Sequence, residues 1–405
     1  MNDDTRGCSR RQFFRIAGAA GLGTLVASRA QAALPKEVGP TLAAGEIAVP
    51  KRPFGKSGID VSILGLGGMF DIAANQLMLQ QAVRWGVTYW DTADCYHRGS
   101  EAGIGKYFAK YPEQREKIFL VTKSDARDPE GIEELLERSL ERMNTSYIDL
   151  YFIHGISTIR ELDQDTRKWA EKAKARNKIR LFGFSTHRNM ERCLTDAAKL
   201  GWVDGIMFSY NFRNMHTEEM QAAVAACVQA GIGLTAMKTQ AGASLFSSDG
   251  VDLQKHFMAK GFTEEQAKLK AVWTNPHIAS ICSQMDSMKL LKVNAAAAGD
   301  PISLSSADLR LLQRHAGETA RNYCAGCGHI CEGAVGLGVP ISDVMRYHMY
   351  CRSYGRSEWA REQFQALDTS LRRRMATADY TEAERRCPNR LPIAQLMHEA
   401  LETYL

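Results

Sequence analysis

The chain has 405 residues, of which 45% are hydrophobic and 24% are charged, and its formal net charge is +5. These values are typical of a globular protein of two or three domains, and they exclude collagen-like, low-complexity and wholly disordered chains. Residues 1–32 hold +3 of the charge, from five arginines and two aspartates, and the remaining +2 predicts no nucleic-acid partner, which would need a concentrated basic face.

The first 32 residues have the three parts of an export signal. The charged start contains Arg10 and Arg11. An uncharged apolar stretch follows at 16–27, and residues 30–32 have the A-x-A form of a cleavage site. The apolar stretch is too short for a membrane-spanning helix, which needs about 20 residues. A basic amphipathic N-terminal helix is the alternative.

The paired arginines resemble a twin-arginine (Tat) signal. That resemblance implies export of an already folded protein to the periplasm, with the Tat machinery as a partner. We expect no transmembrane segment in the mature chain, because the longest uncharged run, 224–237, is interrupted by glycines. Residues 33–50 are rich in proline and glycine, so they are predicted to be a linker.

Residues 51–300 alternate between short β-rich runs and longer helical patterns. Strands are predicted at 61–66, 87–91, 118–123, 148–154, 179–185, 205–209, 234–238 and 278–283. Eight repeats of strand and helix are typical of a closed (β/α)8 barrel, the TIM barrel, which is an α/β fold. A doubly wound open sheet is the alternative, but residues 65–68 lack its G-x-G-x-x-G fingerprint.

Polar residues end several of these strands, and in a barrel the strand ends meet at one catalytic rim. Asp91, Lys123 and His154 end the second, third and fourth strands, and Tyr96 follows in the second loop. Tyr96 suits proton delivery to a carbonyl oxygen, with the Lys123 ammonium favouring its deprotonated form. Asp91 would keep Lys123 charged. A neutral His154 would direct the carbonyl. Each residue alone also has a structural interpretation, but four at four rim positions favour a catalytic site.

Residues 52–297 resemble the aldo-keto reductases. The resemblance rests on the segment 52–58, on Asp91-Thr92-Ala93 with Tyr96, on Val121-Thr122-Lys123 and on the run 149–154 that ends at His154. It implies hydride transfer between a nicotinamide nucleotide, NADP or NAD, and a small-molecule carbonyl or alcohol substrate. In that family's chemistry Tyr96 would be the acid in reduction and the base in oxidation.

The same resemblance implies seven nucleotide contacts, at Ser185, Thr186, Met237, Lys238, Ser283, Lys289 and Asn294. Two of them depart from the family pattern. Thr186 replaces an asparagine that would hold the nicotinamide carboxamide, and Met237 replaces an aromatic residue that would stack on the ring. Because no basic clamp for a 2′-phosphate can be assigned, the choice between NADP and NAD stays open.

The alternation stops after Pro301, and residues 301–405 are predicted to form a small, mostly helical subdomain with five of the ten cysteines. A C-x2-C-x3-C run and a later Cys-Pro pair resemble ferredoxin-type motifs, and a subset of aldo-keto reductases carries such an extension. The resemblance implies a 4Fe-4S cluster held by Cys324, Cys327, Cys331 and Cys387, although the spacing is longer than in the compact motif.

Three alternatives to this ligand set remain at the level of the sequence. Cys351 is a rival fourth ligand. Zinc is the second alternative, held by the three clustered cysteines with His329 or Cys387. The third is that the exported cysteines form disulfides.

The sequence therefore predicts an exported aldo-keto reductase-type oxidoreductase. Its iron-sulfur cluster would pass electrons to a partner or fasten the tail, and its nucleotide would be bound before export. The alternative is a non-enzymatic redox or ligand-binding protein on a retained barrel. The complete set of four rim residues favours the enzyme.

Overall fold

The structure is a computed structural model that describes residues 47–96, 99–240 and 251–405. All of these residues belong to one compact unit, Val38–Leu405. The predicted signal peptide at 1–32 and most of the linker lie outside the described residues. The last linker residues, 47–50, have no regular structure, and Ile47 and Val49 are buried in the core of the barrel.

Eight parallel strands close into a barrel, with β10 pairing with both β9 and β3. The strands are β3 (Leu64–Gly67), β4 (Tyr89–Asp91), β5 (Phe119–Ser124), β6 (Ile148–Ile153), β7 (Ile179–Thr186), β8 (Gly205–Ser209), β9 (Gly233–Met237) and β10 (Ile278–Gln284). They follow one another around the barrel in chain order. The predicted (β/α)8 barrel is confirmed.

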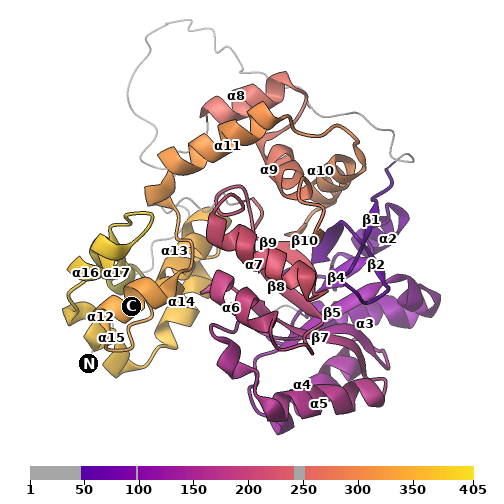
Figure 1. The fold of residues 1–405 in the computed structure, drawn as a ribbon. Helices are drawn as coiled ribbons and strands as arrows, with labels where there is room; N and C mark the ends of the chain where they lie inside the picture. The colour runs from indigo at the N-terminus through magenta and orange to yellow at the C-terminus, as the bar shows by residue number, and fades with distance from the viewer. Residues whose placement is uncertain (1–46, 97–98, 241–250) are drawn as a thin grey trace, which may run out of the picture. The chain divides into compact units, whose positions relative to one another are not determined.

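Helices follow the strands and lie outside them (Figure 1). They are α2 (Gln76–Arg84), α3 (Ser100–Lys110), α4 (Pro129–Arg142), α5 (Gln164–Ala175), α6 (Met190–Ala197), α7 (Glu218–Gln229), α8 (Val251–Ala259), α9 (Glu264–Trp273) and α10 (Met288–Gly299). Helix α4 shows why these segments are helical. The Asp128 side chain accepts a hydrogen bond from the Gly131 N–H, Pro129 begins the helix, and Leu136 on its apolar face is buried.

The first predicted strand, 61–66, is two elements rather than one. β2 (Asp60–Ser62) pairs antiparallel with β1 (Lys51–Pro53) in a hairpin, and β3 alone enters the barrel. The hairpin directs the fully buried Phe54 against the starts of β8 and β9. A Cβ atom at Gly233 would lie 2.4 Å from the Phe54 ring, so this close approach requires glycine. Phe54 therefore closes the end of the barrel opposite the catalytic rim.

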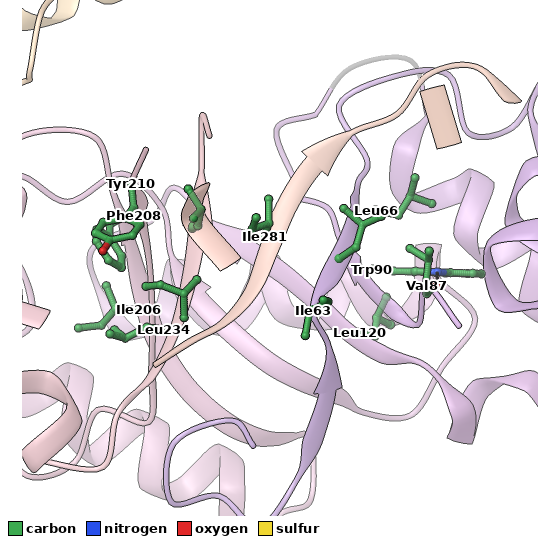
Figure 2. Close-up of a cluster of buried hydrophobic side chains, with 14 of the residues drawn as sticks. Ile63, Leu66, Val87, Trp90, Leu120, Ile206, Phe208, Tyr210, Leu234 and Ile281 are labelled. Atoms are coloured by element: carbon green, nitrogen blue, oxygen red, sulfur yellow. Dashed lines mark hydrogen bonds between the residues drawn. The ribbon is translucent and has the colours of Figure 1, made fainter. Parts of the chain in front are cut away.

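Apolar side chains fill the layer between strands and helices. Figure 2 shows part of this layer, with Leu66, Val87, Leu120 and Ile281 among the buried residues. Trp90 also points into this layer, where its ring lies 5.1 Å from that of Tyr107 on α3. This packing fixes the strands, and with them the positions of the residues at their ends.

The chain after the barrel is helical. It forms α11 (Ser306–Glu318), α12 (Gly328–Val335), α13 (Ile341–Tyr354), α14 (Ser357–Gln365), α15 (Thr369–Thr377), α16 (Thr381–Arg386) and α17 (Ile393–Tyr404), drawn in orange to yellow in Figure 1. Helices α13 to α17 share a hydrophobic core of their own, which includes Val344, Phe364 and Leu396. No helix in the described part of the chain is long and apolar enough to cross a membrane.

Candidate active site

Asp91 and Lys123 form a buried ion pair at the ends of neighbouring strands β4 and β5. The Lys123 Nζ donates to Asp91 Oδ1 at 2.5 Å and to the Thr92 carbonyl at 2.7 Å. The two side chains are only 1% and 2% exposed. A buried ammonium needs such a partner, because an unpaired buried charge is strongly destabilising. The structure thus brings together the pair that the sequence interpretation requires.

Tyr96 lies beside this pair. Its ring centre is 5.1 Å from Lys123 Nζ and 6.0 Å from the His154 ring. Burial, followed by the charge of Asp91, raises the pKa of Tyr96 well above its usual value. Tyr96 is therefore protonated at neutral pH and gives up its proton only to a strong base, such as an alkoxide forming on a substrate. The expectation that the Lys123 ammonium favours the deprotonated phenol stays a prediction.

His154 has an acidic partner that the sequence analysis did not identify. Its Nδ1 lies 3.0 Å from Asp125 Oδ1 and 3.4 Å from the Cys95 sulfur. The interaction with His154 lowers the pKa of Asp125 to about 2 against the opposing effect of burial. An ionised carboxylate only accepts hydrogen bonds, so Nδ1 carries the proton and neutral His154 offers a lone pair at Nε2. Burial lowers the pKa of His154, which favours the neutral ring that the sequence predicts, and the orienting role of that ring stays a prediction.

The Asp125–His154 contact makes a prediction about pH dependence. Burial lowers the pKa of His154, and the Asp125 carboxylate opposes that shift. In Asp125→Asn the His154 pKa falls further, so the limb of the pH–activity profile that reports its protonation moves to lower pH. The measurement is kcat/KM for aldehyde reduction across the neutral range. Asp165→Asn, at an exposed carboxylate on α5, is the matched control. An unmoved limb in Asp125→Asn would show that Asp125 does not govern His154.

The predicted nucleotide contacts lie at strand ends on the same rim. Ser185 and Thr186 end β7, and Met237 ends β9. The Ser185 hydroxyl accepts from the Gly155 N–H at 3.0 Å. The Thr186 hydroxyl lies 2.8 Å from the carbonyl oxygens of both Ile156 and Arg188, so its proton is used within the backbone of the loop. Thr186 consequently lacks a free donor like that of the asparagine it replaces.

The remaining predicted contacts are divided between two places. Ser283, near the end of β10, accepts a hydrogen bond from Asn294 at 3.1 Å, while Lys289 is exposed on α10. Lys238 follows β9 with a left-handed backbone (φ 57°), and its Nζ lies 4.7 Å from the centre of the Tyr350 ring. Met237 and Lys238 therefore lie together at the end of β9, and their contact with a nucleotide stays a prediction.

Four cysteines of the tail line one cavity. They are Cys324, Cys327, Cys331 and Cys387, and the cavity has about 380 Å³ of empty space when its opening to solvent is counted. Neither Cys351 nor His329 lines it, and His329 instead bonds through Nδ1 to Asn189 at 2.9 Å. The described cysteines are all free thiols, without a disulfide. The structure thus groups the four predicted ligands and leaves their two rivals outside.

Burial controls the protonation of these thiols. It raises the pKa of Cys327 to about 11 and that of Cys331 to about 12. No three of the four sulfurs lie within 4.8 Å of one another in the described chain. A metal group bound here would have to displace the thiol protons, because only thiolates are good ligands.

Comparison with known proteins identifies relatives of the barrel. The model of the aldo/keto reductase family matches residues 64–294. An uncharacterized oxidoreductase, YqkF, of Bacillus subtilis is 27% identical over 300 residues, which are 65% of this chain and 96% of that protein. The Schizosaccharomyces pombe aldo-keto reductase yakc [NADP(+)] is 35% identical over 131 residues, 29% of this chain and 37% of that protein.

Solved structures agree with the fold. The holo form of aldo-keto reductase AKR11C1 from Bacillus halodurans aligns with a TM-score of 0.56 at 22% identity, covering 66% of this chain and 96% of that one. The family match ends at residue 294, so α11 to α17 lie beyond it.

Proposed function

The chain belongs to the aldo/keto reductase family, which makes it an oxidoreductase by class, and from this premise we propose that it transfers hydride between NADP or NAD and a carbonyl or alcohol substrate. The observation that carries the proposal is the buried Lys123–Asp91 pair beside the protonated Tyr96. These groups lie at the rim where barrel enzymes carry out their chemistry.

When bound, the nicotinamide nucleotide supplies or accepts the hydride, and the residues of the chain manage the proton. Tyr96 keeps its proton until negative charge develops on the substrate oxygen, and then donates it. Lys123, held by Asp91, keeps a positive charge near that oxygen. His154, whose Nδ1 lies 3.0 Å from Asp125 Oδ1, would orient the substrate carbonyl. In the oxidation direction Tyr96 accepts the proton.

The test is reduction of a small aldehyde by the purified protein with NADPH or NADH supplied in separate assays. Oxidation of either nucleotide that depends on both protein and aldehyde supports the proposal. The nucleotide that is oxidised with the higher kcat/KM is the preferred cofactor. Tight binding of nucleotide without turnover would favour the non-enzymatic redox or ligand-binding alternative.

We further propose that Cys324, Cys327, Cys331 and Cys387 hold a 4Fe-4S cluster. Their common cavity supports this. The cluster would pass electrons to a partner or fasten the tail.

An absorption spectrum with metal and nucleotide analysis of the purified protein tests both cofactors at once. Iron with inorganic sulfide and a brown chromophore supports the cluster. Stoichiometric zinc in a colourless protein contradicts it. Nucleotide released on denaturation supports the hypothesis that nucleotide is bound before export.

The proposed location is the periplasm, reached by the Tat pathway, and it rests on the sequence of residues 1–32 alone. Replacing Arg10 and Arg11 with lysine keeps the positive charge but removes the arginine pair. We expect the double variant to stay in the cytoplasm, as measured by fractionation and immunoblotting. Lysine at Arg6 and Arg29 is the matched control and should be exported. Normal export of the first variant would mean that another route is used.

A further inference from the structure

A second cavity lies between the barrel rim and the tail. Its barrel side includes His187, Ser209 and Lys238, which follow or end β7, β8 and β9. Its tail side includes Arg346 on α13. Cys324 lines this cavity as well as the cysteine cavity, so the two adjoin. The second cavity holds about 520 Å³ of empty space when its opening is counted.

The walls of this cavity are joined by direct contacts. The Asn189 N–H donates to the Gly326 carbonyl at 2.8 Å, and Arg188 forms an ion pair with Asp343 at 2.7 Å. Gly326 has a positive φ of 78°, and a Cβ atom there would lie 2.4 Å from the His187 carbonyl oxygen. Only glycine permits this approach. The rim and the loop that carries Cys324 therefore pack closely against each other.

Two basic side chains of this cavity have unused hydrogen-bonding atoms. His187 Nδ1 and Arg346 Nε are buried without a hydrogen-bond partner. A third basic side chain, Lys238, has its Nζ over the face of Tyr350. A buried polar atom without a partner costs free energy, so a ligand that bonds to His187 Nδ1 or Arg346 Nε would remove that cost.

The charges around the cavity do not balance. Asp343 pairs with Arg188 and also with Arg346, at 3.2 Å, so two arginines share one carboxylate. Lys238 adds a third basic group. Burial, followed by the charge of Arg346, lowers the pKa of Lys238 well below its usual value. Burial also lowers the pKa of His187, and Lys238 and Arg346 add to this effect. An anion placed among these groups would reverse both shifts.

We propose that this cavity binds an anionic group of a ligand, a carboxylate or a phosphate, between Lys238 of the barrel and Arg346 of the tail. Arginine suits such a group because its planar guanidinium bonds two oxygens at once. Tyr350 of the tail lies beside the cavity, since its ring faces Lys238. The tail thus supplies part of the binding site at the barrel mouth.

The identity of the ligand rests on the proposed function. The anion belongs either to a carbonyl substrate that carries an acidic group or to the pyrophosphate of the nucleotide. Three probes separate these sources: inorganic phosphate as a simple anion, the hydroxy acid mandelate with its neutral amide, and NADP. Calorimetric binding to the full-length protein needs no turnover.

We expect Arg346→Met to weaken binding of mandelate or of NADP by about tenfold or more, the effect of losing a charge-assisted hydrogen bond. Lys238→Met should act in the same direction from the barrel side, and Arg346→Lys should restore part of the affinity. Arg361→Met, at an exposed arginine on α14, is the matched control and should bind as the wild type does. If the variants bind mandelate more weakly but bind its neutral amide as the wild type does, the site belongs to an acidic substrate. If they bind NADP more weakly, the site belongs to the nucleotide.

Failure of all three anions to bind the wild type, or equal binding by wild type, Arg346→Met and Lys238→Met, overturns the proposal. Far-ultraviolet circular dichroism of each variant shows whether it has folded. If the anions bind but the protein reduces no carbonyl compound, the anion site stands and the proposed function is rejected. If Arg346→Met and Lys238→Met both reduce the carbonyl substrate as the wild type does, the proposed function stands and the anion site is rejected.

Discussion

Tyr96→Phe should reduce kcat for carbonyl reduction by about 100-fold to 10,000-fold, the range expected when a positioned general acid is removed. The phenol holds a transferable proton beside the Lys123–Asp91 pair in the described active site. Its hydroxyl makes no hydrogen bond with another described residue, so folding should be unaffected. Steady-state kinetics with NADPH and NADH measure the effect, and thermal melting checks the fold.

The matched control for Tyr96→Phe is Tyr147→Phe. Tyr147 lies next to the start of β6, far from the rim, with its ring 3.9 Å from the Arg115 guanidinium carbon. It should keep wild-type turnover. A Tyr96→Phe enzyme that still turns over at a rate near the wild type would remove Tyr96 as the acid.

Lys123→Met is a less informative test of the same site. Removing the ammonium leaves Asp91 buried without its partner, and breaking a buried pair in this way costs about 3–5 kcal/mol. A loss of activity in that variant would combine catalysis and stability. The Tyr96 substitution separates them, because it removes an oxygen that no described residue uses structurally.

The barrel was predictable from the sequence because each strand is a short buried run bounded by turn residues. β6 and β7, for example, are the predicted runs 148–154 and 179–185 to within one residue at each end. The hairpin was harder to predict from the sequence. β2 and β3 are separated by Ile63 alone, and only their pairing partners, β1 and the barrel strands, distinguish them.

The candidate site was predictable where its residues lie at or just after strand ends and match a known motif, as Asp91, Lys123 and His154 do. Asp125 also lies one residue beyond β5, but its role comes from a side-chain contact with His154 that the sequence does not show. Arg346 follows Lys238 by more than one hundred residues along the chain, and no periodicity relates them. Their common cavity exists because Gly326 lets the tail meet the rim, which is a property of packing.

Cys387→Ser should strip iron from the protein, whereas Cys351→Ser should not. Cys387 lines the cavity with the three clustered cysteines, and Cys351 lies on α13 away from it. Loss of one thiolate from four removes most of the binding free energy that a metal group contributes to a folded site. Iron and sulfide content, with the visible absorption spectrum, measure the effect. Loss of iron from Cys351→Ser but not from Cys387→Ser would reverse the ligand assignment.

The structure also limits what loss of the cluster should do to the tail. The sequence alone suggests that the whole region after Pro301 would become sensitive to proteases, because closing the 56 residues from Cys331 to Cys387 costs chain entropy. Helices α13 to α17, however, bury a core of their own, so we expect them to stay folded without the metal. In Cys387→Ser we therefore expect cleavage to concentrate in the loop and helix at 324–335, which pack around the cavity, while the barrel and α13 to α17 resist. Limited proteolysis with mass spectrometry locates the cuts, and cleavage spread through α13 to α17 would show that the cluster, rather than the apolar core, holds the tail together.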